Sequence, residues 1–223
     1  MAYFRDRVEA GNRLASELKE FAVNGVVLAI PRGGVVVGFE IARKLGLDLD
    51  VIVPRKLGAP NNPELAIGAI AEDGTAILDD NLVSYLGVSD EYIRRESERQ
   101  RLEIKRRLAL YRQGALPLSV KGRNVLVVDD GIATGSTMKA ALVSLRRQGA
   151  KKVVVAVPVG PPSTIVELHK LADKVVCLYT PEYFQAIGQF YEDFSQTEDE
   201  EVIGLLRKNK QELADKRLGV GRD

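Results

Sequence analysis

Two adjacent aspartates, Asp129 and Asp130, follow an apolar run and precede a stretch of small residues in VLVVDDGIATGST, residues 125–137. If the apolar run is a parallel strand, both carboxylates lie at its carboxyl end, where open α/β sheets bind ligands. The small residues let backbone amides approach an anion, and the N-terminus of the helix that follows favours negative charge. The segment lacks the lysine and the spacing of a P-loop. Because carboxylates beside a phosphate must engage hydroxyl groups or a cation, the pattern predicts a phosphorylated sugar or a magnesium-bound diphosphate as the ligand.

A second segment, LAIPRGGVVVG at residues 28–38, has the same order of apolar run, polar turn and helix. Arg32 provides a fork of donors that suits a diphosphate, and Gly33 and Gly34 allow the backbone to approach a ligand closely. Taken alone, the segment is equally consistent with a tight turn.

Short apolar runs that alternate with amphipathic stretches indicate an α/β fold with a central, mostly parallel sheet flanked by helices. The predicted strands are 26–30, 49–53, 124–128, 152–159 and 174–179, and the predicted helices are 5–22, 34–45, 136–148 and 163–171. The first helix is expected at the sheet edge or at a subunit contact. Gly46 and Gly149 stand where helices commonly end. The length of 223 residues predicts one domain, residues 1–223.

Residues 54–123 are too many for a simple connection between two strands, which predicts an insertion. Apolar runs on both sides of Asp73-Gly74 predict a hairpin, and residues 89–114 predict a helix capped by Ser89. The arginines of this helix are expected to form a solvated face that pairs with glutamates along the helix. The alternative is a basic arm that closes over an anionic ligand.

The C-terminal part is expected to form a last helix from the capping-box residues TEDE, which begin at Thr197, to about residue 208. The polar end that follows is expected to fray. His169 is expected at the surface without a catalytic role. Cys177, the only cysteine, excludes an internal disulfide and is expected to be a buried core thiol.

The charge balance and the apolar segments exclude several partners. Thirty-two basic residues nearly balance 31 acidic ones, so nucleic acid is not an expected partner. No segment is long and apolar enough to cross a membrane, and the start MAYFRDRVEAGNRL does not resemble a signal peptide. The expected location is the cytoplasm.

At residues 125–137 the sequence resembles the type I phosphoribosyltransferases, whose signature for 5-phosphoribosyl 1-diphosphate (PRPP) is an apolar strand, two acidic residues and a loop of the form xxATGxT. The resemblance implies that Asp129 and Asp130 hold the ribose 2- and 3-hydroxyls. It implies that the loop wraps the 5-phosphate through Ala133, Thr134, Gly135, Ser136 and Thr137. Gly131 departs from the pattern, since the family more often has an aliphatic residue there, and we expect a less constrained loop.

The same resemblance makes Arg32, Gly33 and Gly34 a pyrophosphate loop. It implies a basic residue near the diphosphate at the end of the second strand, for which Lys56 is preferred over Arg55. The alternative is that these two form a solvated pair at the rim of the sheet. The inserted segment at about 54–123 then corresponds to a flap that shields the reaction. Within it, the element NPE at residues 62–64 resembles a bacterial and archaeal subgroup of the family and has no assigned role.

A small hood, at about 179–209, is expected to recognise the acceptor. It begins with the aromatic-rich YTPEYFQAIGQFYEDF, in which Phe184 and Tyr191 are candidates for stacking on the acceptor. The alternative is that these rings only pack the last helix onto the core.

The resemblance implies transfer of 5-phosphoribosyl from PRPP to a nitrogenous acceptor, with a nucleobase as the expected class, and release of diphosphate. Mg²⁺ would be bound mainly through PRPP, without a dedicated set of protein ligands. A homodimer is expected by the same analogy. The main alternative is a PRPP- or nucleotide-binding regulatory protein without transferase activity. A phosphorelay receiver is disfavoured, because its acidic pair belongs at the first strand. The acceptor itself is not identified by the sequence.

Overall fold

A computed structural model gives the structure of the protein and describes residues 3–218. The core is a parallel sheet of five strands in the order β2-β1-β6-β7-β8. These strands are β1 (Gly25–Ala29), β2 (Asp48–Val51), β6 (Asn124–Val128), β7 (Lys152–Val159) and β8 (Lys174–Tyr179). The helices around them are α1 (Arg7–Glu17), α2 (Gly33–Leu45), α5 (Ser136–Arg147), α6 (Pro162–Leu168) and α7 (Asp199–Arg217). The predicted fold class, a parallel sheet flanked by helices, is therefore confirmed.

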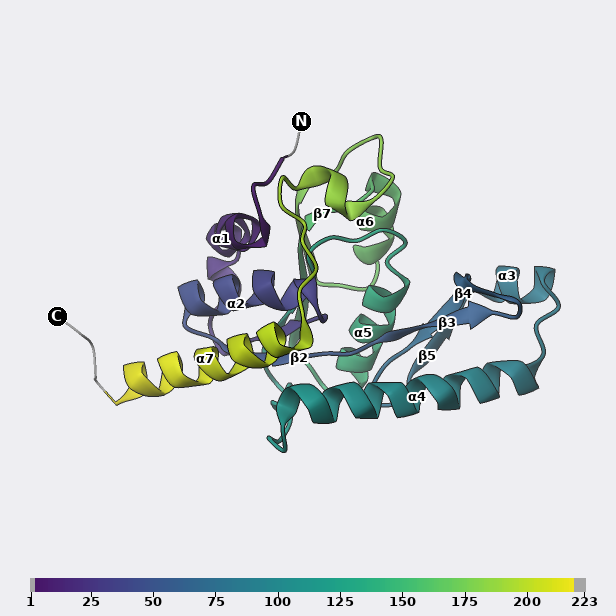
Figure 1. Ribbon diagram of the computed structural model, residues 1–223, viewed down its shortest axis with the longest axis horizontal. Coiled ribbons are helices and arrows are strands. Elements are labelled where there is room, and N and C mark those ends of the chain that lie inside the picture. Colours follow the sequence, from purple (N-terminus) through teal and green to yellow (C-terminus); the bar gives the residue numbers. More distant parts are fainter. Residues whose placement is uncertain (1–2, 219–223) are drawn as a thin grey trace.

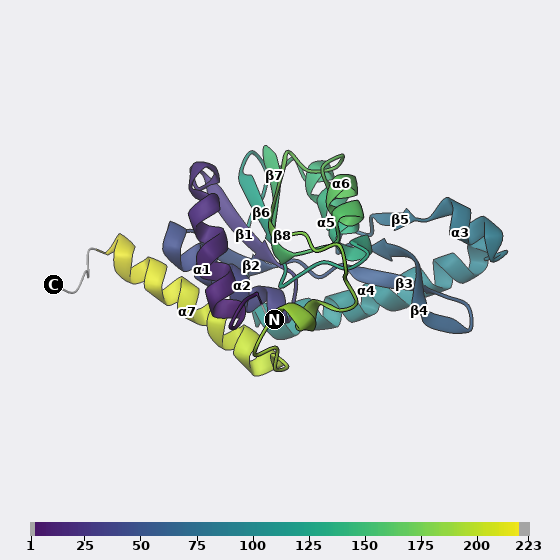
Figure 2. The same cartoon turned by 90° about the horizontal axis from the view of Figure 1, so that it is seen from above.

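Both faces of the sheet are apolar and covered. Val27, Leu126 and Val154 contribute to a core shared with α1, α2 and α7, whereas Val26 and Val125 contribute to a second core shared with α5 and α6. This alternation is the period of two expected for strands that are buried on both faces. Figures 1 and 2 show the two groups of helices on opposite sides of the sheet. Helix α1 packs against α2 and reaches β7 and the edge strand β8, so it covers a face of the sheet near that edge.

The order of the strands creates a switch point between β1 and β6. The chain leaves β1 through α2 to β2 on one side, and later returns to place β6 on the other side of β1. Ala29 pairs with Val128 at the carboxyl ends of these two strands, so the loops that follow them lie next to each other. Ligands of open α/β sheets bind at such a point, because the helices that follow the two strands diverge to opposite faces.

The inserted segment forms a separate antiparallel sheet of β3 (Arg55–Ala59), β4 (Asn62–Ile70) and β5 (Ala76–Leu78), followed by α3 (Asp80–Tyr85) and α4 (Asp90–Arg112). We call residues 55–85 the flap. The predicted hairpin turn is present: Gly74 has φ of 85° and the Thr75 amide donates to Asp73 Oδ1 at 2.9 Å. Ser89 caps α4 by accepting from the Tyr92 amide at 3.2 Å. In Figure 1 the flap projects away from the core, and α4 runs along it and back to the core.

Several arginines of α4 pair with glutamates of the same helix, whereas Arg112 at its end pairs with Asp50 of β2 and with Glu72. Arg99 lies 2.7 Å from Glu96, and Arg106 and Arg107 each lie 2.8 Å from Glu103. These two guanidinium groups lower the pKa of Glu103 to about 2. The geometry therefore favours the solvated-face interpretation over a free basic arm.

The C-terminal helix differs from its prediction at both ends. Its N-cap is Glu198 rather than Thr197, without a capping side chain, and it continues to Arg217 rather than ending near residue 208. The helix is longer because Asn209 and Leu213 are buried against the core, which local sequence signals do not report. Residues 219–223 of the predicted frayed end lie outside the described residues.

Two smaller expectations concern single side chains. His169 is exposed at the end of α6, as expected. Cys177 is half-buried rather than fully buried, and burial raises the pKa of its thiol to about 11, which disfavours the reactive thiolate. Among residues 3–218, no helix is long and apolar enough to cross a membrane.

Asn209 closes the free edge of the core sheet. It is 1% exposed, its Oδ1 accepts from the Leu49 amide at 2.9 Å, and its Nδ2 donates to the Leu47 carbonyl at 3.1 Å. The side chain thereby takes the place of a neighbouring strand for β2, whose edge would otherwise leave these groups unpaired.

Replacing Asn209 with alanine should lower the free energy of unfolding by about 2 kcal/mol or more, because two buried backbone groups lose their partners. Urea unfolding of Asn209→Ala and of Lys210→Ala, an exposed neighbour on α7, measures the difference. The Lys210 variant should stay within about 0.5 kcal/mol of the wild-type protein. Equal stability of the two variants would contradict the edge-closing role.

Candidate active site

A cavity of about 480 Å³ opens at the switch point between β1 and β6. Its walls come from the loops after these two strands, from α1 and from the segment that precedes α7. The lining residues are Arg7, Pro31, Arg32, Gly33, Asp129, Asp130, Ile187, Phe194, Gln196 and Thr197. The two segments singled out by the sequence are thus brought together, although almost one hundred residues separate them.

The glycines of the first loop make room for the aspartates of the second. A Cβ atom on Gly33 would lie 1.9 Å from Asp130 Oδ2, and one on Gly34 would lie 2.9 Å from the Asp129 Cα atom. Any side chain at either position would therefore displace the acidic pair. The two loops form one packed unit, in which the glycines are required by close approach.

The two aspartates have different surroundings. Asp130 is 8% exposed and paired with an arginine, whereas among residues 3–218 Asp129 forms no ion pair, and its Oδ1 accepts from the Asp130 amide at 2.8 Å. Burial raises the pKa of Asp129 well above its ordinary value, and the negative charge of Asp130 raises it further. The pair therefore combines an ion-paired carboxylate with a neighbour whose charge is disfavoured.

Arg7, which the sequence reasoning did not select, is the partner of Asp130. Its Nε donates to Asp130 Oδ2 at 2.7 Å, its Nη1 donates to the Ser195 carbonyl at 2.8 Å, and its guanidinium lies 3.9 Å from the centre of the Phe194 ring. Arg7 is the first residue of α1, which is capped by Asp6. An arginine near the start of the chain has no local pattern that links it to an aspartate 123 residues later.

The loop after the aspartates presents backbone donors at the start of α5. Gly135 has φ of 72°, a conformation that favours glycine. No hydrogen-bond partner for the amides of residues 133–135 is present within the described chain. Thr164 holds the loop from α6 by donating to the Ala133 carbonyl at 2.7 Å. Free amides at a helix N-terminus form a site suited to a phosphate.

Two further basic candidates are already paired with carboxylates. Arg32 lies 3.3 Å from Glu198 at the start of α7, and Lys56 lies 2.8 Å from Glu64 of the NPE element. Lys56 belongs to the flap strand β3, not to the end of β2, and does not line the cavity. Arg55 points elsewhere, since its Nε donates to Gln100 of α4 at 3.0 Å and burial lowers its pKa. Lys56 therefore has the freer side chain of the two.

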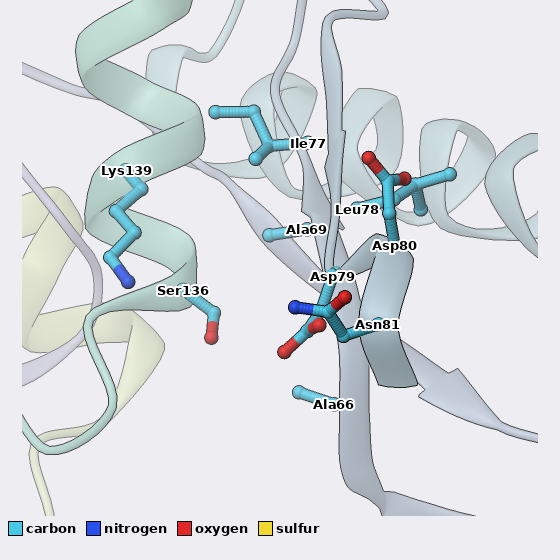
Figure 3. Close-up of a pocket in the computed structure, with 10 residues that line it drawn as sticks. Ala66, Ala69, Ile77, Leu78, Asp79, Asp80, Asn81, Ser136 and Lys139 are labelled. Carbon is cyan, nitrogen blue, oxygen red and sulfur yellow. The ribbon is translucent and has the colours of Figure 1, made fainter. Parts of the chain in front are cut away.

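A second cleft, of about 470 Å³, separates the flap from α5. Figure 3 shows Ser136 and Lys139 on α5 facing Ala66, Asp79 and Asn81 of the flap across this gap. Ser136 belongs to the predicted phosphate loop as well as to the wall of this cleft. The loop thus faces the flap on one side, so that a ligand held there lies between the flap and the core.

The segment before α7 differs from the expected hood. It spans about residues 180–198 and contains the short helix η2 (Ile187–Phe190), whereas α7 packs on α2 and β2 as part of the core. We call residues 180–198 the hood. Its backbone is paired with the start of the chain: the Tyr3 and Phe4 amides donate to the Phe190 carbonyl, and the Glu192 amide donates to Phe4, all at 2.9 Å.

The aromatic candidates of the hood do not line the cavity. Tyr191 is 5% exposed, packs between Phe4 and Phe194, and donates from its hydroxyl to the Asp130 carbonyl at 2.7 Å. Phe184 packs against Phe190. In this structure both rings pack against rings of the hood and of the chain start, rather than packing the last helix onto the core. The cavity is lined instead by Phe194 and Ile187.

Ile187 also accounts for Gly131. A Cβ atom on Gly131 would lie 2.5 Å from Ile187 Cγ2, so the hood side chain fills the space that an aliphatic residue would take in the loop. The expectation of a less constrained loop is therefore not met, because the missing side chain is supplied from another segment.

The residues present fit a magnesium ion that arrives with its substrate. Within residues 3–218, no group of three or more His, Cys, Asp or Glu side chains could hold a metal ion. No ion pair within the described chain engages the Asp129 carboxylate, and Mg²⁺ commonly combines one or two carboxylates with phosphate oxygens. An ion here would thus be shared between Asp129 and a ligand.

The parallel sheet brings the acidic pair, the predicted phosphate loop and the glycine-rich segment together at its switch point, where open α/β sheets bind ligands. The family described as "Phosphoribosyl transferase domain" matches residues 5–195. The chain belongs to this family, which confirms the resemblance found at residues 125–137.

Relatives extend the match over nearly the whole chain. "Putative phosphoribosyl transferase Rv0571c" of Mycobacterium tuberculosis (strain ATCC 25618 / H37Rv) is 44% identical over 216 residues, which cover 96% of this chain and 49% of that protein. The chain thus spans about half the length of the curated relatives that it matches first. The crystal structure of TT1426 from Thermus thermophilus has a TM-score of 0.80 and 44% identity, and covers 93% of this chain and 99% of that chain. A uracil phosphoribosyltransferase of Staphylococcus aureus (strain Newman) is 26% identical over 176 residues, 76% of this chain and 75% of that protein.

Gly33→Ala should lower the free energy of unfolding by about 1–3 kcal/mol, because its Cβ would overlap Asp130 and Arg7. Gly204→Ala is the matched control, because this glycine lies on α7 with no described atom within 4 Å of its Cβ position. The substitution should raise the free energy of unfolding by about 0.5–1 kcal/mol. Chemical unfolding of the two variants gives both values. A Gly33 variant as stable as the wild type would show that the loops are not tightly packed.

Asp129→Asn should stabilise the protein increasingly as pH rises. Because the native pKa of Asp129 is raised above the ordinary value of 3.8, the folded state binds more protons than the unfolded state between that value and the raised pKa. Asp129 therefore lowers the stability of the wild type as pH rises through this window, and asparagine removes the effect. Thermal unfolding of both proteins from about pH 4 to pH 8 should show a growing advantage for the variant. A constant or shrinking difference would contradict the raised pKa.

Proposed function

We propose that the protein is a phosphoribosyltransferase that transfers 5-phosphoribosyl from PRPP to a nitrogenous acceptor, with a nucleobase as the expected class, and releases diphosphate. The observation that carries the proposal is the junction at the switch point. There, Gly33 and Gly34 pack directly on Asp129 and Asp130, beside a loop with free amides. PRPP carries three groups that match these elements: a phosphate for the loop amides, a diol for the aspartates and a diphosphate for the glycine-rich segment.

Each element of the site would bind a different group of PRPP. The amides and hydroxyls of Ala133, Thr134, Gly135, Ser136 and Thr137 would bind the 5-phosphate at the N-terminus of α5. Asp129 and Asp130 would accept hydrogen bonds from the ribose hydroxyls. Arg32 and the amides of Gly33 and Gly34 would bind the diphosphate, for which Arg32 must exchange its contact with Glu198.

The reaction breaks the bond between the ribose anomeric carbon and a diphosphate oxygen, and forms a bond from that carbon to the acceptor nitrogen, which loses a proton. Positive charge builds on the ribose while diphosphate leaves, and the carboxylates of Asp129 and Asp130 would stabilise that charge. Mg²⁺, when bound with PRPP, neutralises the departing diphosphate. Lys56 would add a second positive charge if the flap closes and Lys56 leaves Glu64. Such closure also excludes water, which would otherwise hydrolyse PRPP.

The acceptor would meet the hood wall formed by Ile187 and Phe194. Phe184 and Tyr191 would then support this wall from behind, since they are packed in the hood. The purine and pyrimidine classes both fit a wall of this kind. A homodimer, a cytoplasmic location and a single domain complete the proposal, all three by analogy with the family.

The alternative is a regulatory protein that binds PRPP or a nucleotide without transfer. The observation that favours it is the pairing of three charged candidates in the free protein: Asp130 with Arg7, Arg32 with Glu198 and Lys56 with Glu64. A site held in this way binds a ligand only by exchanging partners, which suits a sensor as well as an enzyme.

Diphosphate release from PRPP and Mg²⁺ should depend on one base from a panel of purines and pyrimidines, and Asp130→Asn should reduce it at least ~100-fold through loss of charge stabilisation. Asp173→Asn is the control: this aspartate is paired with Arg146 at 2.6 Å at the amino end of β8, away from the cavity. The Asp173→Asn variant should release diphosphate at the wild-type rate. PRPP binding measured by calorimetry without any release would favour the regulatory alternative, and absence of both would contradict a PRPP site.

A further inference from the structure

The contacts of Arg7 join three segments, namely α1, the loop after β6 and the hood, whose relative positions matter for the proposed reaction. Its Nε is bonded to Asp130 after β6, its Nη1 is bonded to the Ser195 carbonyl in the hood, and its guanidinium covers Phe194. The side chain is only 11% exposed, and that of Asp130 is 12% exposed. An arginine can make these contacts together, because its planar fork offers several donors and a flat face for an aromatic ring.

Arg7 itself is held rigidly from the other side. The Asp6 carboxylate caps α1 by accepting from the Glu9 amide at 2.7 Å. The preceding residues 3–5 pair with hood residues 190–193 through their backbones. The hood is therefore fixed in two parts: residues 190–193 by the chain start, and residues 194–197 by the Arg7 side chain.

Arg7 also forms a wall between two cavities. The 480 Å³ cavity and a neighbouring cavity of about 220 Å³ both have Arg7, Gln196 and Thr197 among their lining residues. Loss of the Arg7 side chain would join the two spaces and free Phe194. Arg7 thus shapes the acceptor side of the site together with Gln196 and Thr197.

We infer that Arg7 is a positioning residue of the site, which fixes the Asp130 carboxylate and holds hood residues 194–197 against it to form the wall that the acceptor meets. The inference rests on the proposed function for its effect on the reaction, and on the geometry alone for its effect on the hood. Arg7 acts through Asp130, Ser195 and Phe194, and its contribution is the placement of the acceptor relative to the ribose.

Three variants separate the contacts. Arg7→Lys can keep a single bond to Asp130 but cannot also reach the Ser195 carbonyl and cover Phe194. Arg7→Ala loses all three contacts. Arg13→Gln is the matched control, because Arg13 lies on the same helix with its guanidinium over the Tyr3 and Phe4 rings and does not line the cavity.

Hydrogen exchange measured by mass spectrometry tests the hood without any substrate. In Arg7→Lys and Arg7→Ala, residues 194–198 should exchange at least ~10-fold faster than in the wild type, whereas residues 190–193 should change little. Arg13→Gln should leave residues 194–198 unchanged. Wild-type exchange of this segment in both Arg7 variants would overturn the inference, whatever the protein catalyses.

Kinetics test the effect on the reaction with the base that supports diphosphate release. Arg7→Lys should raise the KM for the acceptor at least ~10-fold while the calorimetric Kd for PRPP changes less than ~3-fold, and millimolar methylguanidinium should restore part of the acceptor use of Arg7→Ala. A parallel loss of PRPP affinity, acceptor use and thermal stability in Arg7→Lys would show a merely structural role and overturn the inference. If the wild type releases no diphosphate with any base, the proposed function fails, and the exchange experiment still decides the placement of the hood.

Discussion

The ion pair between Arg7 and Asp130 is the interaction on which the site depends. It is mostly shielded from water, and such a pair is costly to break because the partner left behind keeps an uncompensated charge. The pair gives Asp130 a cation in contact, whereas burial and the charge of Asp130 raise the pKa of the neighbouring Asp129. It also explains why a helix at the start of the chain and a hood near residue 195 belong to the same site as the loop after β6.

The rest of the architecture brings these segments to one place. Pairing of β1 with β6 puts the glycine-rich loop against the acidic pair, and the glycines are needed because the approach leaves no room for a Cβ atom. Helix α7 closes the edge of the sheet through Asn209, which supports β2 and the flap that follows it. The flap and α4 remain separate from the cavity, with a cleft between the flap and α5. The core therefore supports the two packed loops, and residues 3–7 fix the hood beside them.

Three of the charged candidates are paired in the free protein. Arg32, Lys56 and Asp130 each have an oppositely charged partner outside the two ligand loops. The exposed pairs Arg32–Glu198 and Lys56–Glu64 are weak, because water screens their charges. The pair Arg7–Asp130 is shielded from water and is screened less. A ligand that brings phosphate groups would thus exchange the exposed pairs readily and leave the shielded pair in place. This difference separates groups that bind a ligand from a group that positions the site.

The sequence by itself determined the parallel sheet, the order of strands and helices, and the loop at residues 125–137, because these follow from local periodicity and from residue types within a short segment. It also indicated the family to which the chain belongs. Only the tertiary structure decided that Arg7 pairs with Asp130, that Phe194 and Ile187 line the cavity in place of Phe184 and Tyr191, and that Ile187 fills the space beside Gly131. It also decided that α7 continues to Arg217. These contacts join residues far apart in the chain, and the packing that selects them has no counterpart in the local sequence.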